Sequence, residues 1–91
     1  MSEFSGNALV ERAELIQTRE DFTVFVSLLL RNQQEHPEEW ENNTIELFLQ
    51  GLGGFVGSIK GYYSNIGSDV DTERPGWRVL ADALLAARVY E

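Results

Sequence analysis

The chain has 91 residues, of which 15 are acidic and 7 basic, so its formal net charge at pH 7 is −8. This length suits one domain with one hydrophobic core, and we assign residues 1–91 to a single domain in which residues 1–6 are flexible. Such a negative domain repels nucleic acids and anionic membranes and suits a basic protein partner. The alternative is that the acidity only keeps a small protein in solution.

The sequence has no cysteine, which excludes disulfides, thiolate zinc sites and cysteine nucleophiles. Its first residues lack the basic start and the unbroken apolar run of a signal peptide. No apolar stretch approaches the roughly 18 residues that a membrane-spanning helix needs. We therefore expect a cytoplasmic protein that does not cross a membrane.

The first predicted element covers residues 8–16, where the spacing of apolar residues suits a short helix. A short strand is the alternative. Thr18 and Asp21 then form a plausible capping box, although Glu or Gln is the usual partner of the threonine. Apolar residues recur at helical spacing after this box, which predicts a central helix. It should end at residues 34–36, because Pro37 disfavours helix in the residue before it.

Residues 37–43 are predicted to form a turn with one short helical turn. Asn42 or Asn43 can cap the helix that follows, because a side-chain oxygen at this place accepts from an early backbone N–H. An apolar stripe with helical spacing predicts that this helix runs over residues 44–64.

A polar loop is predicted over residues 65–74, and Pro75 is well placed as the first residue of a last helix that continues nearly to Glu91. The expected fold class is therefore all-α. The architecture is a small bundle of three helices, or of four if residues 8–16 are helical, with neighbours packed antiparallel because the links are short.

Glycines are dense in the helix predicted over residues 44–64. Its five glycines cost about 4–5 kcal/mol relative to alanines. Gly53, Gly57 and Gly61 are spaced four apart and would form a flat strip that another helix can approach closely, within the domain or in a second chain. The strip is thus a candidate for self-association, and the alternative is a kinked or broken helix without a role.

Acidic residues surround a tryptophan in the predicted turn, where Trp40 is flanked by Glu38, Glu39 and Glu41. An aromatic anchor within a collar of charges is typical of a binding hot spot. The alternative is that Trp40 covers one end of the core while the acids are solvated.

A second acidic group lies in the polar loop, at Asp69, Asp71 and Glu73. The alternating acids are similar to the opening of a calcium loop, but Arg74 stands where glycine is needed and Leu80 where glutamate is needed. We expect a solvated loop that contributes to a partner surface, and no metal site.

Catalysis finds little support in the sequence. The one histidine, His36, has no second histidine or cysteine with which to build a zinc site or a nucleophilic pair. The glycines lack the Lys-Ser/Thr that follows a phosphate loop. We expect no catalytic residue and no cofactor, and we expect Arg78 and Asp82 to form an ion pair within the last helix.

One set of residues supports a resemblance to a known family, namely Pro37-Glu-Glu-Trp40-Glu41-Asn42-x-Thr44, Phe48, Gly61-Tyr62-Tyr63, Pro75-x-Trp77, Ala81-Asp82 and Ala87-x-x-Tyr90-Glu91. This pattern resembles a family of small acidic bacterial proteins of unknown function, over roughly residues 18–91. The glycine-dense stretch is unusual for the pattern. The resemblance implies a cytoplasmic bacterial protein, and it implies no catalytic residue.

Two functions follow as expectations. The first is an acidic protein-binding module, such as an immunity-type inhibitor of a basic toxin or nuclease. The second is a self-associating adaptor or accessory protein, a homodimer joined through the glycine strip. The residues predicted to bind the basic partner are Glu38, Glu39, Trp40, Glu41, Asp69, Asp71 and Glu73.

Overall fold

Helices are the only regular secondary structure in the residues that the computed structural model describes, which are 3–68, 71, 73 and 76–90. In chain order they are α1 (Gly6–Glu14), α2 (Arg19–Glu35), the 3₁₀ helix η1 (Pro37–Glu39), α3 (Ile45–Gly57), α4 (Ile59–Asn65) and α5 (Trp77–Ala87). The all-α class is confirmed, with more helical segments than the three to four predicted. Within the described ranges, none of these helices combines the length and apolarity that a membrane crossing requires.

The first two helices begin at side-chain caps. Residues 8–16, which were predicted as a helix or a strand, lie largely in the helix α1. Its N-cap is Ser5, whose hydroxyl accepts a hydrogen bond from the backbone N–H of Ala8 at 3.3 Å. The capping box of α2 is confirmed: Thr18 Oγ1 accepts from the Asp21 N–H at 3.0 Å, and Asp21 Oδ2 accepts from the Thr18 N–H at 3.2 Å. As predicted, α2 ends just before Pro37.

The helix predicted over residues 44–64 is in fact two helices, α3 and α4, which meet at Ser58. The N–H of Ser58 donates to the carbonyl oxygens of Gly54 at 3.2 Å and Phe55 at 3.0 Å, and so ends α3. Because glycine favours helix least apart from proline, a break directly after Gly57 costs little. The structure therefore shows a broken helix, which was the alternative to one continuous helix.

The cap of α3 also differs from the prediction. Its N-cap is Thr44, whose hydroxyl accepts from the Leu47 N–H at 3.1 Å. The prediction of Asn42 or Asn43 as the cap is wrong, because the Asn42 side chain donates instead to backbone carbonyls at the end of α5.

The last helix is shorter at both ends than predicted. It begins at Trp77 after an extended Gly76, whereas the predicted first residue, Pro75, lies outside the described residues. It ends at Ala87 because the chain then turns, with the N–H groups of Val89 and Tyr90 both donating to Ala86 O at 3.0 and 2.9 Å.

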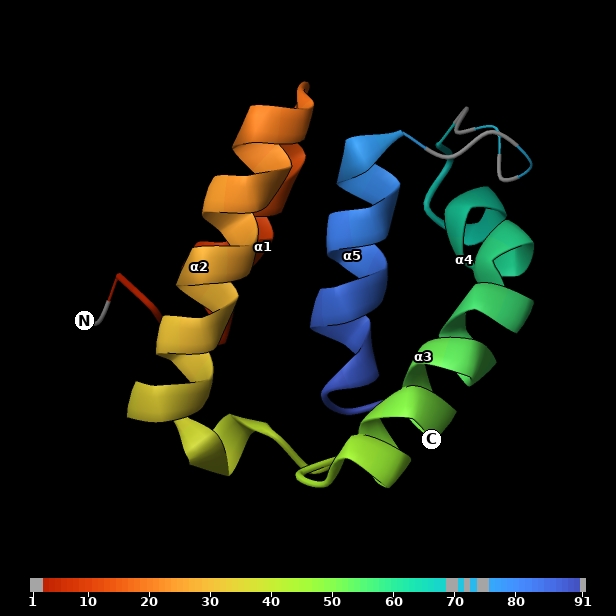
Figure 1. Ribbon diagram of the computed structural model, residues 1–91. Helices are drawn as coiled ribbons and strands as arrows, with labels where there is room; N and C mark the ends of the chain where they lie inside the picture. The colour runs from red at the N-terminus through yellow and green to blue at the C-terminus, as the bar shows by residue number, and fades with distance from the viewer. Residues whose placement is uncertain (1–2, 69–70, 72, 74–75, 91) are drawn as a thin grey trace.

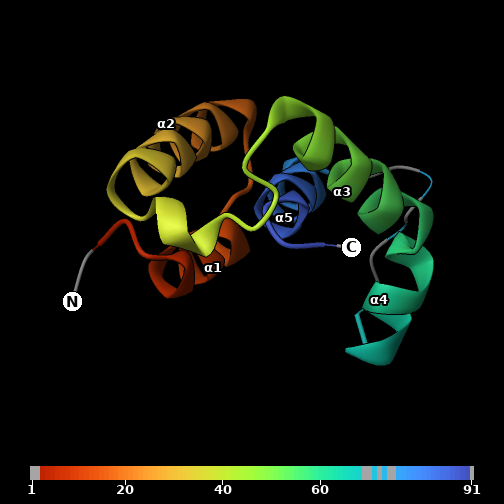
Figure 2. The same ribbon diagram turned by 90° about the horizontal axis from the view of Figure 1, so that it is seen from below.

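α5 is the central helix, with α1 and α2 on one side and α3 on the other (Figures 1 and 2). Its Ala81 and Leu85 belong to a core shared with α1 and α2, whereas its Val79 and Ala83 belong to a second core shared with α3 and α4. Alanine presents only a methyl group, so neighbouring helices can pack against both sides of α5.

Candidate functional site

The segment that follows α2 passes the C-terminal end of α5 (Figure 2). It is fixed there by Asn42, whose N–H donates to Arg88 O at 2.8 Å and whose Nδ2 donates to Ala87 O at 2.9 Å and Tyr90 O at 2.8 Å. The last carbonyl groups of a helix have no partner within the helix. Asn42 therefore caps α5 and ties the two segments together.

The side chain of Asn32 is the centre of a buried polar network behind this segment. It is fully buried, and its Oδ1 accepts from Trp40 Nε1 at 2.8 Å and from Arg88 Nη1 at 3.1 Å. Its Nδ2 donates to Phe4 O at 2.6 Å and to Glu39 Oε1 at 2.7 Å. Both ends of the amide are thus satisfied, as a buried polar group requires.

Glu39, which was predicted to bind a partner, belongs to the same network. Its Oε1 accepts from the Gly6 N–H at 2.9 Å as well as from Asn32, and lies 3.4 Å from Nη1 of Arg88. The hydrogen bond from Asn32, together with that from Gly6 and the charge of Arg88, lowers the pKa of the Glu39 carboxyl below its ordinary value. Glu39 therefore connects α1, α2 and the end of α5 by internal bonds.

Arg88 closes the network from the C-terminal side. It is buried, its Nε donates to Leu85 O at 2.9 Å, and its guanidinium carbon lies 5.8 Å from the centre of the Trp40 ring. Burial lowers the pKa of this arginine, while the nearby Glu39 carboxylate opposes that effect. Two paired charges and one amide thus hold Trp40 in place.

Sequence reasoning missed Asn32 and Arg88, although one signal for Asn32 was present. Phe25, Leu29 and Asn32 lie on one face of α2 at helical spacing, and all three are buried. A polar residue on the apolar face of a helix is informative, because it needs partners when buried. Arg88 carried no such signal, since it follows the last residue of α5.

Trp40 also lines a pocket on the surface. Its ring stacks on that of Phe48, with centroids 5.7 Å apart and planes at 21°, while other atoms of Trp40 pack on the core of α1, α2 and α5. The pocket has a volume of about 330 Å³ and is lined by Gln33, Pro37, Trp40, Asn42, Asn43, Thr44, Ile45 and Phe48. Trp40 therefore covers one end of the core, which was the alternative interpretation, and it also lines the pocket.

The remaining acids of this segment point into solvent. Glu38, Glu41 and Glu46 are exposed, and Glu38 has one neighbour of possible opposite charge, His36, whose Nδ1 lies 3.3 Å from Glu38 Oε1. There is no lysine or arginine between residues 32 and 59. The surface around the Trp40 pocket is therefore negative.

The second acidic group lies elsewhere. Asp71 and Glu73 are exposed, and Asp71 Oδ1 accepts from the Glu73 N–H at 3.0 Å, whereas Asp69 lies outside the described residues. Asp71 and Glu73 come before α5 in the chain, whereas Trp40 lies beside Arg88, directly after the last residue of α5. The structure does not bring Asp71 and Glu73 next to Trp40.

The three glycines of the predicted strip face open space. A Cβ atom placed on Gly53, Gly57 or Gly61 would meet no other atom within 4 Å, so the strip makes no close contact inside the domain. The glycine in close contact is Gly51, where a Cβ would lie 2.7 Å from Ala87 O. Gly51 was not part of the predicted strip, and α3 approaches the end of α5 at this residue.

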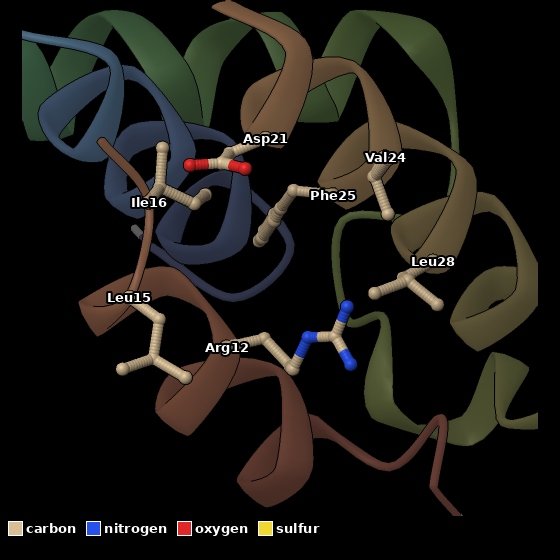
Figure 3. A pocket seen from close by; sticks show the side chains of 7 residues that line it. All are labelled: Arg12, Leu15, Ile16, Asp21, Val24, Phe25 and Leu28. Carbon is tan, nitrogen blue, oxygen red and sulfur yellow. The ribbon is translucent and has the colours of Figure 1, made fainter. Parts of the chain in front are cut away.

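A second cavity of about 320 Å³ lies between α1 and α2 and is lined by Arg12, Leu15, Ile16, Asp21, Val24, Phe25 and Leu28. The guanidinium of Arg12 points between the two helices (Figure 3). The carboxylate of Asp21 is held at the start of α2 by the N–H groups of Gln17 and Thr18, which lower its pKa. None of the predicted site residues lies here.

A half-buried acid lies on the other side of α5. Asp82 was predicted to pair with Arg78, and Arg78 Nε lies 3.9 Å from its Oδ2. Its shorter contact is with Tyr63, whose hydroxyl donates to the same oxygen at 2.6 Å. Burial raises the pKa of the Asp82 carboxyl, and burial together with this hydrogen bond raises the pKa of the Tyr63 hydroxyl. Over the described part of the chain, no three acidic or histidine side chains converge to hold a metal ion.

Comparison with known proteins gives one match. Residues 18–91 match the profile of DUF7660, a family of unknown function, which confirms the resemblance to an unknown-function family. No curated protein and no solved structure matches the chain.

Proposed function

Since the chain belongs to DUF7660, a family whose function is unknown, we propose a function from its structure: the protein is a binding module for a basic protein partner and catalyses no reaction. The observation that carries this proposal is the Trp40 pocket, in which stacked aromatic rings lie within a negative surface. Aromatic anchors in pockets supply much of the energy of protein interfaces.

The proposed anchor and the proposed steering charges are distinct residues. Trp40 and Phe48 form the aromatic wall, and Ile45 beside them is 74% exposed although it is aliphatic. Glu38 and Glu41 would act at long range and accelerate the encounter with a cationic partner, because complementary charge acts mainly on the association rate. Asp71 and Glu73, at the far end of α5, would add to the overall field.

The partner class follows from the charge. A net charge of −8 favours a positively charged protein, and an immunity-type inhibitor that covers a basic toxin or nuclease is one form of such a module. We place the protein in the cytoplasm of a bacterium. A gene for a basic toxin next to the gene of this protein would favour this form.

A second candidate function is self-association. The exposed strip of Gly53, Gly57 and Gly61 offers a surface without side chains to a second copy. In this function the protein is an adaptor or accessory protein that forms a homodimer. Repulsion between two copies of charge −8 opposes such a dimer, so it should form more readily as salt concentration rises.

The test is binding after charge reversal. Glu38→Lys together with Glu41→Lys should slow association with a partner captured from the native cell at low salt, and added salt should slow the wild type in the same way. Glu11→Lys together with Glu20→Lys is the matched control, because it makes the same change in net charge on exposed sites of α1 and α2. If the two double variants associate equally fast, the Trp40 pocket is not the steering site.

A further inference from the structure

Two apolar stripes run along the exposed sides of α2 and α3. In α3, Ile45, Leu49, Leu52 and Val56 are spaced four, three and four residues apart, which places them on one side of the helix. Ile45 is 74%, Leu49 56% and Val56 49% exposed. The stripe is separate from the buried face of α3, whose centre is Gly51 and Phe55.

The stripe on α2 consists of the apolar residues Phe22, Val26 and Leu30, and the polar Gln33 follows them at helical spacing on the same side. Leu30 is 56% and Val26 42% exposed. These residues lie on the side of α2 opposite to Val24 and Leu28, which line the cavity against α1.

Three observations place both stripes on one face of the molecule. Gln33, which follows the α2 stripe, and Ile45 of the α3 stripe line the same pocket. Phe22, at the other end of the α2 stripe, contacts the Trp77 ring of α5 with centroids 5.5 Å apart. In Figure 2, α2 and α3 lie on the two flanks of α5, and both lie toward the upper edge of the view, whereas α1 lies below α5.

α5 contributes the middle of this face through Trp77 and Leu80, which are also exposed. We call the whole surface the apolar face; it consists of Phe22, Val26, Leu30, Gln33, Ile45, Leu49, Leu52, Val56, Trp77 and Leu80. Isolated exposed apolar residues are ordinary, whereas exposed apolar residues that three neighbouring helices present together are typical of a site of interaction.

We infer that the apolar face docks an amphipathic helix of the basic partner, with the positively charged part of that helix beside Glu38 and Glu41. The inference rests on the proposed function and specifies the form of the partner. A helix satisfies its own backbone hydrogen bonds and can therefore lie on an apolar surface, where it is anchored by residues spaced three and four apart.

Length and charge restrict the occupant. The 13 residues of α3 span about 20 Å, so the docked helix needs about four turns. A second copy of this chain is disfavoured because both copies carry a charge of −8. A partner helix with lysine or arginine at one end is attracted to the exposed acids beside the Trp40 pocket, and its apolar side covers the stripes.

The experiment uses the full chain and two synthetic peptides of about 14 residues made of leucine and lysine. In the first peptide the leucines recur at helical spacing; in the second, with the same composition, they alternate with lysines. The helical pattern should shift the NMR methyl signals of Ile45, Leu49 and Leu80. Leu49→Ser combined with Val56→Ser should weaken its binding at least about tenfold.

Leu15→Ser is the matched control, since Leu15, the residue after the end of α1, is 72% exposed and lies off the apolar face. It should leave peptide binding unchanged. Three outcomes would each overturn the inference. The alternating peptide could bind equally well, the shifted signals could be centred on α1, or zwitterionic lipid vesicles could perturb the apolar face in place of the peptide.

The proposed function fails in a different way. If a captured basic partner depends on Glu38 and Glu41 but not on Leu49 and Val56, then the partner does not dock a helix on the apolar face, and the binding module itself stands. If charge reversal at Glu38 and Glu41 has no more effect than the control on the captured partner, the proposed function is wrong.

Discussion

At the scale of single residues, one amide side chain determines how the Trp40 segment is held. Asn32 contacts Trp40, Glu39 and Arg88, and each of these contacts links α2 to another part of the chain. An exposed acidic collar was predicted here, yet Glu39 is taken up by internal bonds while Glu38 and Glu41 remain exposed. Which of these acids is bonded internally depends on partners that are distant in the chain, and a local sequence pattern does not reveal them.

Asn32→Ala should reduce the free energy of unfolding by about 3 kcal/mol, because it leaves Trp40 Nε1 and part of the Arg88 guanidinium buried without an acceptor. Urea denaturation measures the change. Gln33→Ala, at the exposed neighbouring position, should change stability by less than about 0.5 kcal/mol. Equal effects of the two substitutions would show that the network is not formed.

The pH dependence of stability should reveal how much the ionised Glu39 carboxylate stabilises the fold. Its pKa in the folded protein is below its ordinary value of 4.5, so its contribution is complete above that pH and is lost as pH falls through the lower folded pKa. Glu39→Gln should therefore lose less stability than the wild type on acidification below pH 4.5. Parallel curves of stability against pH, from denaturation at each pH, would contradict the assignment.

Asp82 should act in the opposite direction. Burial raises its folded pKa above the ordinary value of 3.8, so the unfolded chain releases this proton first and stability falls as pH rises through the window above 3.8. Asp82→Asn should remove this fall while keeping an oxygen that can accept from Tyr63. The variant would disprove the account if its stability decreased with pH in this window as steeply as that of the wild type.

At the scale of helices, apolar periodicity predicted helix after residue 18 but left residues 8–16 undecided between helix and strand, and local chemistry predicted the start of α2. The capping box at Thr18 and Asp21 was confirmed because both partners lie within one turn. The boundary between α3 and α4 was foreseen only as the alternative of a broken helix, and the C-terminal end of α5 was missed. The first is a break in a backbone weakened by glycines, and the second depends on Asn42, which is 45 residues away from Ala87 in the chain.

The glycines of α3 give a matched pair of substitutions. Gly51→Ala should destabilise the protein by about 1–3 kcal/mol, because its Cβ would lie 2.6 Å from Asn42 Nδ2 and 2.7 Å from Ala87 O. Gly53→Ala should stabilise it by up to about 1 kcal/mol, because a Cβ there meets nothing within 4 Å and alanine favours helix. Thermal or urea unfolding of both variants tests the packing of α3 on α5, and stabilisation by Gly51→Ala would contradict it.

At the scale of the whole molecule, the residues that support the family resemblance act largely as structural links. Asn42 donates to the carbonyl groups of Ala87 and Tyr90 at the end of α5, Trp40 donates to Asn32, and the Tyr63 hydroxyl donates to Asp82. The spacing of apolar residues was sufficient to predict the all-α fold, whereas the basic partner stays a prediction from the acidic balance. The apolar face was not predicted, because it is assembled from three helices whose relative placement depends on the two cores around α5.

The most direct test of partner binding is photo-crosslinking in the native cell from two exposed positions of α3, one beside the Trp40 pocket and one in the glycine strip. A photoreactive residue at Ile45, beside the Trp40 pocket, should capture a basic protein, and charge reversal at Glu38 and Glu41 should reduce the yield. The same residue at Gly53 should capture no specific protein. Capture of a second copy of this chain from Gly53, with nothing basic captured from Ile45, would contradict the account and support self-association.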